Sequence, residues 1–564
     1  MRMTGAQAII KGLIDHGIKN VYGYPGGAVL PLYDALYETR DIRHVLMRSE
    51  QAAAHAASGV SRTSNTVGVC IATSGPGATN LVTGIATAYM DSVPMIAITG
   101  QVPTGLIGTD AFQEVDITGI TLPIVKHSYL VKNAEEIPQI LEDAFHIANT
   151  GRKGPVLIDI PKNVQMTEFE YIEPEETRLR GYKPNYEPNK KQIARVADEI
   201  QKAKRPLILT GGGMVHAKAA PRLRALLQTV EIPVISTLMS LGTVPNRHPL
   251  YFGMLGLHGR PVANFAVSKC DLLISLGARF DDRTTLVPET FAPEATIVHV
   301  DVDPAEIDKN IETRVPIVAD LGRFIEELAK KAEPKTCRDW VKQLTDWNDA
   351  YPFKYQEDDA LKPQIVLRAL SDLTDGNAFI TTEVGQHQMW AAQFYRYQEP
   401  GRLITSGGLG TMGYGLPAAI GAAMENPGKT VVNIAGDGSF QMNMGEIGTA
   451  VEQGLPIKLL LFNNRSLSLV RQLQYFGAGK RYSGIDFTCN PDFCKLVEAY
   501  PDTETYRIER PDQVEDVLKT ALANDKFTLI ECIVSNEERV YPVACPTNGL
   551  NKMNYLDDVE IVCE

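Results

Sequence analysis

The sequence predicts an α/β protein built from three doubly wound parallel-sheet domains. Short apolar runs alternate with helical stretches along the chain, the pattern of parallel strands joined by crossover helices. The 564 residues are too many for one core, so several domains are expected. The polar, Pro-rich stretch 168–190 and the charged helical stretch around 326–349 divide the apolar runs into three blocks.

Each block contains several strand-like runs, and most end in a Gly-rich or polar turn. We expect domains at residues 1–167, 190–350 and 363–540, followed by a tail, 541–564, with little pattern. The runs, in order, are VGVCIAT, PMIAITG and GPVLIDIP, then RPLILTGGG, IPVIST, CDLLISLG and ATIVHVDVD, then AFITTEVG, TVVNIAGDG, IKLLLFNN and FTLIECIV. Ligands of open parallel sheets bind at the carboxyl ends of strands, so these turns predict cofactors that carry phosphate.

Composition excludes some classes of protein. The formal net charge of −13 argues against a nucleic-acid partner, which needs a basic face. No apolar stretch approaches the roughly 20 residues that cross a bilayer, and the N-terminus does not read as a signal peptide, so we expect a cytoplasmic protein without a membrane partner. The eight cysteines are scattered. Cys489 and Cys494 form the one close pair, and no second pair completes a zinc site.

The segment GDGSFQMN and the pair Asn463-Asn464 predict a metal and diphosphate site. Asp437 and Asn464 each follow an apolar strand and lie 27 residues apart, which leaves room for one crossover helix near 445–453. A carboxylate and an amide oxygen then lie side by side, and both suit Mg²⁺. Ser466 is a third candidate ligand. Gly436, Gly438 and Ser439 surround a helix start that favours phosphate. A lone GDG is usually a plain turn, but the whole spacing resembles the thiamine-diphosphate signature.

Glu50 is the candidate catalytic carboxylate. It follows a short apolar run and begins an Ala-rich helix. On these residues alone, the simpler interpretation is a helix N-terminal acid stabilised by the helix dipole.

Eight longer segments carry a resemblance to a known family. They are YGYPGGAVLPLYDAL, EQAAAHAASG, ATSGPGATNLVTGIATAYMDSVPMIAITGQVP, IGTDAFQEVDI, GPVLIDIPKNVQ, ARFDDR, VGQHQMWAAQ and SGGLGTMGYGLPAAIGA. They resemble the catalytic subunit of acetohydroxyacid synthase, also called acetolactate synthase. The resemblance extends over nearly the whole chain, to about Ile533.

The resemblance implies a pyrimidine-binding domain, a central FAD-binding domain and a diphosphate-binding domain. It implies that Glu50 hydrogen-bonds the pyrimidine ring of thiamine diphosphate and so promotes loss of its C2 proton, a task that needs a carboxylate. Met412 would hold the cofactor in its bent shape. A Met is more often core packing, but the flanking glycines favour the cofactor role. The other residues implied at the diphosphate end are Val384, Gly385, Gln386, His387 and Gly410.

FAD binding is predicted mainly by the resemblance. The middle block has no GxGxxG fingerprint, so its residues alone leave dinucleotide binding open. The segment ARFDDR favours the biosynthetic, FAD-containing type, because a subgroup used in fermentation lacks it. The candidate FAD residues are Gly211, Gly212, Gly213, Gly256, His258, Arg279, Asp281, Asp301 and Asp320.

Arg283 matches the arginine that receives the acceptor's carboxylate, a task suited to a guanidinium. The alternative is an ion pair with Asp281 or Asp282. The resemblance also implies that further residues line the reaction pocket, although Lys162 alone would read as a surface lysine. These residues are Gly27, Phe112, Gln113 and Lys162.

The sequence departs from the family pattern at several positions. Ser49 replaces a histidine before Glu50, Ser468 and Leu469 follow the Asn pair, and the tail after Tyr541 differs. Leu473 stands where the family has tryptophan. We expect this change to weaken the preference for 2-ketobutyrate over pyruvate as acceptor, and to weaken binding of sulfonylurea herbicides.

The predicted reaction is decarboxylation of pyruvate on thiamine diphosphate and transfer of the two-carbon unit to a second 2-keto acid, the first common step of branched-chain amino acid biosynthesis. The resemblance implies Mg²⁺ and FAD, a homo-oligomer that shares active sites between subunits, and possible pairing with a small regulatory subunit. The alternatives are a related lyase or oxidase, and a catalytically weak homologue.

Overall fold

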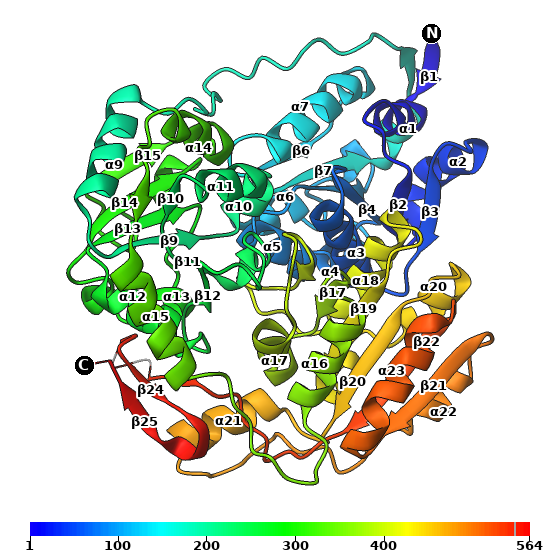
Figure 1. The fold of residues 1–564 in the computed structure, drawn as a ribbon. Helices are drawn as coiled ribbons and strands as arrows, with labels where there is room; N and C mark the ends of the chain where they lie inside the picture. Colours follow the sequence, from blue (N-terminus) through cyan, green and yellow to red (C-terminus); the bar gives the residue numbers. More distant parts are fainter. Residues whose placement is uncertain (546, 548, 564) are drawn as a thin grey trace.

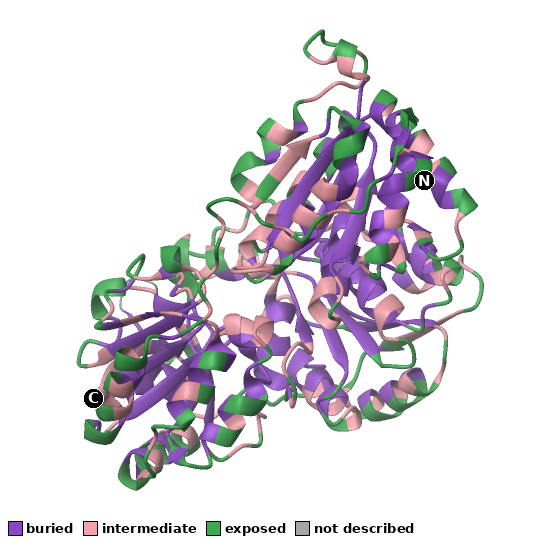
Figure 2. Cartoon of the chain, turned by 90° about the horizontal axis from the view of Figure 1, so that it is seen from above, coloured by how far each residue is buried: buried purple, intermediate pink, exposed green. Residues whose placement is uncertain are grey.

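Three six-stranded parallel sheets, each flanked by helices, form the framework of the chain (Figure 1). The structure is a computed structural model that describes residues 1–545, 547 and 549–563. In Figure 2 the buried strands lie inside the layers, while exposed residues gather on the outer faces of the helices and in the loops. Across the described residues, none of the helices combines the length and apolarity that a membrane-crossing segment needs.

The first sheet contains the N-terminal strands in the order β3-β2-β4-β5-β7-β6. Its strands are β2 (Asn20–Gly23), β3 (Arg43–Leu46), β4 (Gly68–Ala72), β5 (Met95–Gln101), β6 (His127–Leu130) and β7 (Pro155–Pro161). Its helices are α1 (Gly5–Asp15), α2 (Leu30–Glu38), α3 (Glu50–Thr63), α4 (Pro76–Asn80), α5 (Val82–Met90), α6 (Ile117–Thr121), α7 (Ile137–Asn149) and α8 (Lys162–Met166). β4, β5 and β7 are buried along their whole length, as expected of central strands covered on both faces.

The third sheet repeats this topology in the order β18-β17-β19-β20-β22-β21. Its strands are β17 (Phe379–Thr382), β18 (Leu403–Ile404), β19 (Val431–Gly436), β20 (Lys458–Asn463), β21 (Thr503–Ile508) and β22 (Phe527–Ile533). Its helices are α16 (Pro363–Leu373), α17 (Gln386–Phe394), α18 (Gly415–Glu425), α19 (Asp437–Phe440), α20 (Glu446–Glu452), α21 (Ser468–Gly477), α22 (Phe493–Glu498) and α23 (Val514–Ala523). In both sheets the strand order reverses between the first and third strands, and such a switch point is where open α/β sheets bind ligands.

The middle sheet has the order β12-β11-β9-β13-β14-β15. Its strands are β9 (Pro206–Thr210), β11 (Val234–Ser236), β12 (Tyr251–Met254), β13 (Leu272–Leu276), β14 (Thr296–Asp301) and β15 (Val315–Val318). Its helices are α9 (Lys190–Lys202), α10 (Gly213–His216), α11 (Ala220–Leu226), α12 (Pro261–Lys269), α13 (Asp282–Thr285), α14 (Leu321–Ala329) and α15 (Arg338–Ala350). Numbered along the chain, this order is 3-2-1-4-5-6, that of dinucleotide-binding folds, with the switch point between β9 and β13.

Helices α3 and α18 join the first and third sheets. Small residues let the two backbones approach closely, since a side chain on Gly59 would clash with the carbonyl of Ala418, and one on Gly421 with that of Ala56. One continuous hydrophobic core therefore includes residues from both sheets.

Short sheets secure the connecting segments. β1 (Arg2–Thr4) pairs with β8 (Glu168–Glu170), and β10 (Val230–Glu231) pairs with β16 (Lys335–Thr336). The tail, which shows little sequence pattern, forms three antiparallel strands, β23 (Val543–Ala544), β24 (Lys552–Asn554) and β25 (Glu560–Val562). Tail residues pack around Phe265 of α12, so the tail lies against the middle domain. In Figure 1 the red tail strands lie beside α15.

Candidate active site

Asp437 and Asn464 meet at the carboxyl edge of the third sheet, because each follows one of the paired strands β19 and β20. Burial raises the pKa of Asp437 to about 6, and hydrogen bonds, first from Asn490 and then from backbone amides that include Asn464, oppose the rise. Asn490 donates its Nδ2–H to Asp437 Oδ2 at 2.7 Å. No described residue forms an ion pair with Asp437, and a buried carboxylate of this kind is a natural partner for a cation.

Ser466 adds a third oxygen to this group. Its backbone N–H donates to Asn464 Oδ1 at 3.2 Å, while its own Oγ is buried and has no hydrogen-bond partner in the described part of the chain. Carboxylate, amide and hydroxyl oxygens are the hard ligands that Mg²⁺ prefers, so the donor set fits that ion. Asn490 was not predicted, since it lies in a loop that no strand-end pattern marks.

The start of α17 brings two more polar side chains to this edge. The His387 ring lies against Gly436, where an added Cβ would be 2.9 Å from His387 Nδ1. Burial lowers the pKa of His387 to about 3, so the ring is neutral. Gln386 donates to Gln472 Oε1 and to the carbonyl oxygen of Glu538, both at 2.9 Å. His387 Nε2 and Gln386 Oε1 are buried without a partner among the described residues, as expected of groups that await a polar ligand.

The other predicted residues here shape the backbone. A Cβ on Gly438 would lie 2.6 Å from Leu467 Cδ2, so a side chain would need Leu467 to move. Ser439 is buried and donates to the carbonyl oxygen of Gly436 at 3.3 Å. Both lie in α19, which begins at Asp437. Val384 and Gly385 form the turn between β17 and α17.

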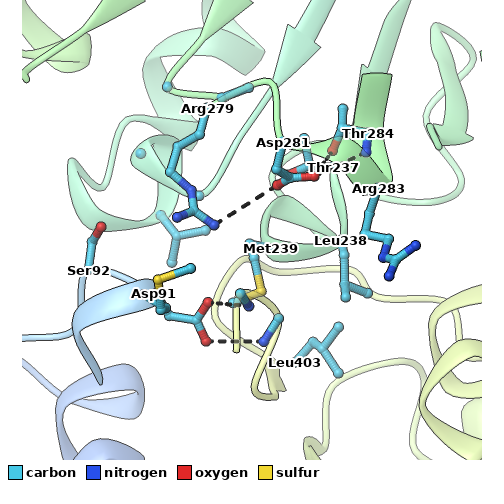
Figure 3. A pocket seen from close by; sticks show the side chains of 18 of the residues that line it. Asp91, Ser92, Thr237, Leu238, Met239, Arg279, Asp281, Arg283, Thr284 and Leu403 are labelled. Atoms are coloured by element: carbon cyan, nitrogen blue, oxygen red, sulfur yellow. Dashed lines mark hydrogen bonds and ion pairs between the residues drawn. The ribbon is translucent and has the colours of Figure 1, made fainter. Parts of the chain in front are cut away.

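The loop that carries Gly410 and Met412 is anchored to the first domain. The Asp91 carboxylate accepts the backbone N–H of Gly407 at 3.1 Å and that of Gly408 at 2.7 Å, as Figure 3 shows. Arg62 pairs with the same buried carboxylate at 2.6 Å. Asp91 was not predicted.

Glu50 begins α3 at the carboxyl edge of the first sheet. Ser49 caps the helix by accepting the N–H of Ala52, and Glu50 Oε2 accepts the Nδ2–H of Asn80 at 3.0 Å. Gly77 lies beside the same carboxylate, since its Cβ would be 3.2 Å from Glu50 Oε1. Glu50 is half-buried, so part of the residue remains accessible.

The remaining predicted pocket residues of the first domain follow strands of the same sheet. Gly27 comes after β2, Phe112 and Gln113 after β5, and Lys162 after β7. The Gln113 backbone packs against Gly75, where a Cβ would be 2.9 Å from Gln113 Cα. A Cβ on Gly27 would meet no described atom within 4 Å, and Phe112 is 89% exposed. In a single chain, the carboxyl edge of the first sheet is therefore exposed around Gly27 and Phe112.

One cavity of about 1730 Å³ lies where the three domains meet. It begins at the switch point of the middle sheet, where the Gly211 N–H donates to the carbonyl of Leu276 at 2.9 Å and that of Gly213 to the carbonyl of Gly277 at 3.0 Å. Of the predicted FAD residues, those that line this cavity are Gly212, Gly213, His258, Arg279, Asp281, Asp301 and Asp320. The lining also includes Val384 and Gly410, so the cavity reaches the predicted thiamine-diphosphate residues of the third domain.

The charged side chains of this cavity are held by local contacts. Asp281 caps α13 by accepting the N–H and Oγ–H of Thr284, and Arg279 Nη2 lies 4.0 Å from its carboxylate (Figure 3). Burial raises the pKa of Asp301 to about 6, although its Oδ1 accepts the N–H of Asp303 at 2.9 Å.

Two further predicted FAD residues join the cavity to other segments. His258 is buried, its Nδ1 lies 3.3 Å from the carbonyl oxygen of Pro542, and burial lowers its pKa to about 4. Asp320 caps α14 through the N–H of Arg323. Gly211 and Gly256 pack against other backbone rather than the cavity, Gly256 against the carbonyl of Arg283.

The sequence left open whether Arg283 binds a ligand or pairs with a neighbouring aspartate. Its Nε lies 3.8 Å from Asp282 Oδ2, and its side chain is 71% exposed, so the guanidinium remains largely available. Leu473 of α21, 62% exposed, lines the same cavity. Glu50, Gly27, Phe112, Gln113 and Lys162 are not among the lining residues of this cavity. Asp437, Asn464 and Ser466 are not among them either, so a single chain places the predicted site residues at the edge of the first sheet, at the edge of the third sheet and in this cavity.

Family models of thiamine pyrophosphate enzymes match all three parts of the chain: the N-terminal TPP binding domain at residues 3–120, the central domain at 193–328 and the C-terminal TPP binding domain at 383–532. The acetolactate synthase large subunit of Corynebacterium glutamicum is 47% identical, with 98% of this chain and 90% of the relative covered. The isozyme 3 large subunit of Escherichia coli is 43% identical, with 98% of each covered. This chain belongs to the acetolactate synthase large-subunit family. The probable large subunit of Methanocaldococcus jannaschii is likewise 45% identical, with 98% of this chain and 95% of the relative covered.

Membership of the family of thiamine pyrophosphate enzymes accounts for the repeated topology. The match to the N-terminal TPP binding domain covers β2 to β5 of the first sheet, and the match to the C-terminal one covers β18 to β21 and most of β22 of the third. The two sheets have the same strand order. The central domain contains the sheet with the dinucleotide-binding order.

Proposed function

We propose that this enzyme decarboxylates pyruvate and transfers the two-carbon unit to a second 2-keto acid, as an acetolactate synthase does, with thiamine diphosphate, Mg²⁺ and FAD as cofactors. One observation carries the proposal. The carboxyl edge of the first sheet presents Glu50, and the matching edge of the equally folded third sheet presents Asp437 beside Asn464. The carboxylate for proton chemistry and the metal-diphosphate site would thus lie at equivalent edges of two sheets with the same topology.

The buried polar atoms without partners support the diphosphate site. Asp437, Asn464 and Ser466 would hold Mg²⁺, and the buried, unpartnered Nε2 of His387 would face the polar end of the cofactor. Gln386 would contribute its free Oε1 to the same polar network. Thiamine diphosphate, when bound, supplies the carbanion chemistry and takes up the electrons that decarboxylation releases.

The strand order and the cavity support FAD in the middle domain. The cavity volume exceeds the roughly 300–1,000 Å³ of ordinary ligand pockets and suits a dinucleotide. Gly212 and Gly213 would let the backbone approach the pyrophosphate, and the buried carboxylate of Asp301 would accept hydroxyl hydrogens.

Glu50 would hold a proton on the pyrimidine ring. Asn80 fixes its Oε2, and the residue is half-buried rather than enclosed, which supports access by a ligand. The guanidinium of Arg283 would bind the carboxylate of the acceptor keto acid in a bidentate pair, which orients its carbonyl carbon for attack.

We further propose that two copies of the chain complete each active site. The exposed apolar side chains around the first-sheet edge include Phe112 at 89% and Leu122 at 68%, which a second copy would cover. The relatives are named large subunits, which supports a partner small subunit that regulates this enzyme. We place the enzyme in the cytoplasm and in branched-chain amino acid biosynthesis, and we assign its domains to residues 1–167, 190–350 and 363–540.

The test is product analysis of the purified protein with Mg²⁺, thiamine diphosphate and FAD, given pyruvate alone and then pyruvate with 2-ketobutyrate. We expect acetolactate and, with both substrates, 2-aceto-2-hydroxybutyrate. Glu50→Gln should lower the rate by about 10²–10⁴-fold, while the matched surface variant Glu135→Gln should not. Acetaldehyde or acetate as the sole product would instead assign a decarboxylase or an oxidase, and no consumption of pyruvate would refute the proposal for the isolated chain.

A further inference from the structure

Glu446 of α20 contacts the backbone that leads into Glu50. Its Oε1 accepts the backbone N–H of Arg48 at 2.8 Å, and the N–H of Ser49 also points at this carboxylate. Arg48 and Ser49 form the turn between β3 and α3, and Glu50 is the first residue of α3. A carboxylate from the third domain thus binds the two amides that precede the proposed catalytic residue of the first.

The Glu446 carboxyl group is buried, and both of its oxygens accept hydrogen bonds. Glu446 is 1% exposed, and its second oxygen, Oε2, accepts the hydroxyl hydrogen of Thr449 at 2.7 Å. Burial raises the pKa of Glu446, and hydrogen bonds from Thr449, Arg48 and Ser49 oppose that rise. Two backbone amides and one hydroxyl thus converge on this buried carboxyl group, which is well suited to hold the turn in place.

Other side-chain contacts of Arg48 and Ser49 are exposed or remain within α3. Arg48 Nη2 also pairs with Glu452 Oε2 at 2.8 Å, but that pair lies at the surface, where ion pairs contribute little. The Ser49 hydroxyl caps α3 and does not reach α20. Thr449 of the same helix is also buried and lies 3.2 Å from the carbonyl oxygen of Leu46, at the end of β3. Among these contacts, Glu446 is the one that accepts the amides of the Arg48–Ser49 turn.

We propose that Glu446 is a positioning residue for Glu50: it fixes the Arg48–Ser49 turn and thereby the place of the Glu50 carboxylate against the pyrimidine ring. The inference rests on the proposed role of Glu50. A displacement of about 1 Å in a reacting group can cost about 10²-fold in rate, so a buried contact two residues away can control the chemistry without touching the cofactor.

The same α20 follows the metal loop, since Glu446 lies nine residues after Asp437. The connection between β19 and β20 therefore contains both the proposed metal ligand Asp437 and Glu446, which contacts the Arg48–Ser49 turn. Loss of Glu446 should nevertheless leave the affinity for Mg²⁺ and thiamine diphosphate unchanged, because Asp437 is placed by the end of β19 and Asn464 by the end of β20, not by α20.

The experiment compares Glu446→Ala, Glu446→Gln and the control Glu452→Gln, which removes the surface ion pair with Arg48 but not the amide contact. Amide hydrogen exchange in the peptide that contains residues 47–50 reports the turn. Deuterium exchange at C2 of bound thiamine diphosphate, followed by proton NMR after acid quench, reports the step that Glu50 drives.

We expect Glu446→Ala to speed amide exchange at Arg48 and Ser49 and to slow C2 exchange by about 10–100-fold, with the Kd for thiamine diphosphate and the KM for pyruvate nearly unchanged. Glu446→Gln keeps one oxygen acceptor and should have a smaller effect on both. Glu452→Gln should match the parent enzyme. The Gln variant keeps the test decisive if the Ala variant does not fold.

Glu50→Gln, measured in parallel, separates the two possible failures. If it exchanges C2 hydrogen as fast as the parent, the proposed role of Glu50 is wrong, whatever the Glu446 variants show. If Glu50→Gln is slow but every Glu446 variant that folds exchanges C2 hydrogen at the parent rate, the positioning role is refuted and the proposed function stands.

Discussion

Arg283 and Leu473 line one cavity although they lie 190 residues apart in the chain, Arg283 on α13 of the middle domain and Leu473 on α21 of the third. The guanidinium of Arg283 and the apolar side chain of Leu473 thus line the same cavity. A 2-keto acid has a carboxylate at one end and a short alkyl group at the other, so this pair can recognise both ends of one acceptor.

Arg283→Gln should change the fate of pyruvate rather than its uptake. Without the guanidinium, the second keto acid is held less well, and more of the two-carbon unit should leave as acetaldehyde. A hydrogen bond to a charged group contributes about 1.5–3 kcal/mol, so the ratio of acetolactate to acetaldehyde should fall by roughly 10–100-fold. Arg247→Gln, which removes a surface arginine paired with Asp375, is the control. An unchanged ratio would assign the acceptor carboxylate to another group.

Leu473→Trp tests the departure from the family pattern. A flat, larger wall should fit the ethyl group of 2-ketobutyrate better and raise the share of 2-aceto-2-hydroxybutyrate in a competition assay by about tenfold, the range that one methylene supplies in an apolar pocket. Val470→Trp places the same side chain on the same helix outside the cavity lining and should leave the product ratio alone. A strong preference for 2-ketobutyrate in the parent enzyme would show that Leu473 does not weaken it.

Asp301→Ala should weaken flavin binding. Its buried carboxylate lines the cavity at the end of β14, where it would accept hydrogen bonds from the cofactor's hydroxyl groups. Loss of a charged acceptor should raise the Kd for FAD about tenfold or more, measured by quenching of flavin fluorescence. Asp308→Ala, which removes a carboxylate bound to the N–H of Thr313, serves as the control. Equal FAD affinity in both variants would remove Asp301 from the site.

Glu383→Gln should change how stability depends on pH. The Glu383 side chain is fully buried, and burial raises its pKa to about 7, above the usual 4.5, although its Oε1 accepts the N–H of Leu416 at 3.1 Å. Between these values the folded protein keeps a proton that the unfolded chain releases, so rising pH costs stability until about pH 7 and no more above it.

A glutamine resembles the protonated acid and does not titrate. The melting temperature of Glu383→Gln relative to the parent should therefore rise from pH 5 to pH 8 and level off beyond. Thermal unfolding of both proteins at several pH values measures it. The exposed variant Glu498→Gln should show no such trend, and a constant difference for Glu383→Gln would mean that Glu383 keeps an ordinary pKa.

The central strands could be predicted from sequence because both of their faces are buried and they read as unbroken apolar runs. Edge strands lack this signal: β6 is half-exposed, and β18 has two residues. The tail strands of two or three residues are too short to show any period. Such short or exposed strands form because they pair with an adjacent strand, and the sequence alone does not show which strand that is.

Local sequence signals also decide which site residues could be predicted. Asp437 and Asn464 were predictable because polar residues directly after strands share one edge of a sheet. Glu383 also follows its strand directly, so the same argument could have found it. Asp91, Glu446 and Asn490 could not be found in this way, because their importance comes from contacts with segments far away in the chain.

The close backbone contact between α3 and α18 restricts how such an enzyme can be recombined. A chimaera that takes its N-terminal domain from one relative and its C-terminal domain from another would have to match two helices at Gly59 and Gly421, where even a methyl group is too large. A single mismatched residue there would part the two domains and, with them, the contact of α20 with the Arg48–Ser49 turn. Exchange of the central domain alone leaves the α3–α18 contact intact. Breakpoints in the segments 171–189 and 351–362, which lie outside β8 and α9, should therefore yield folded hybrids most readily.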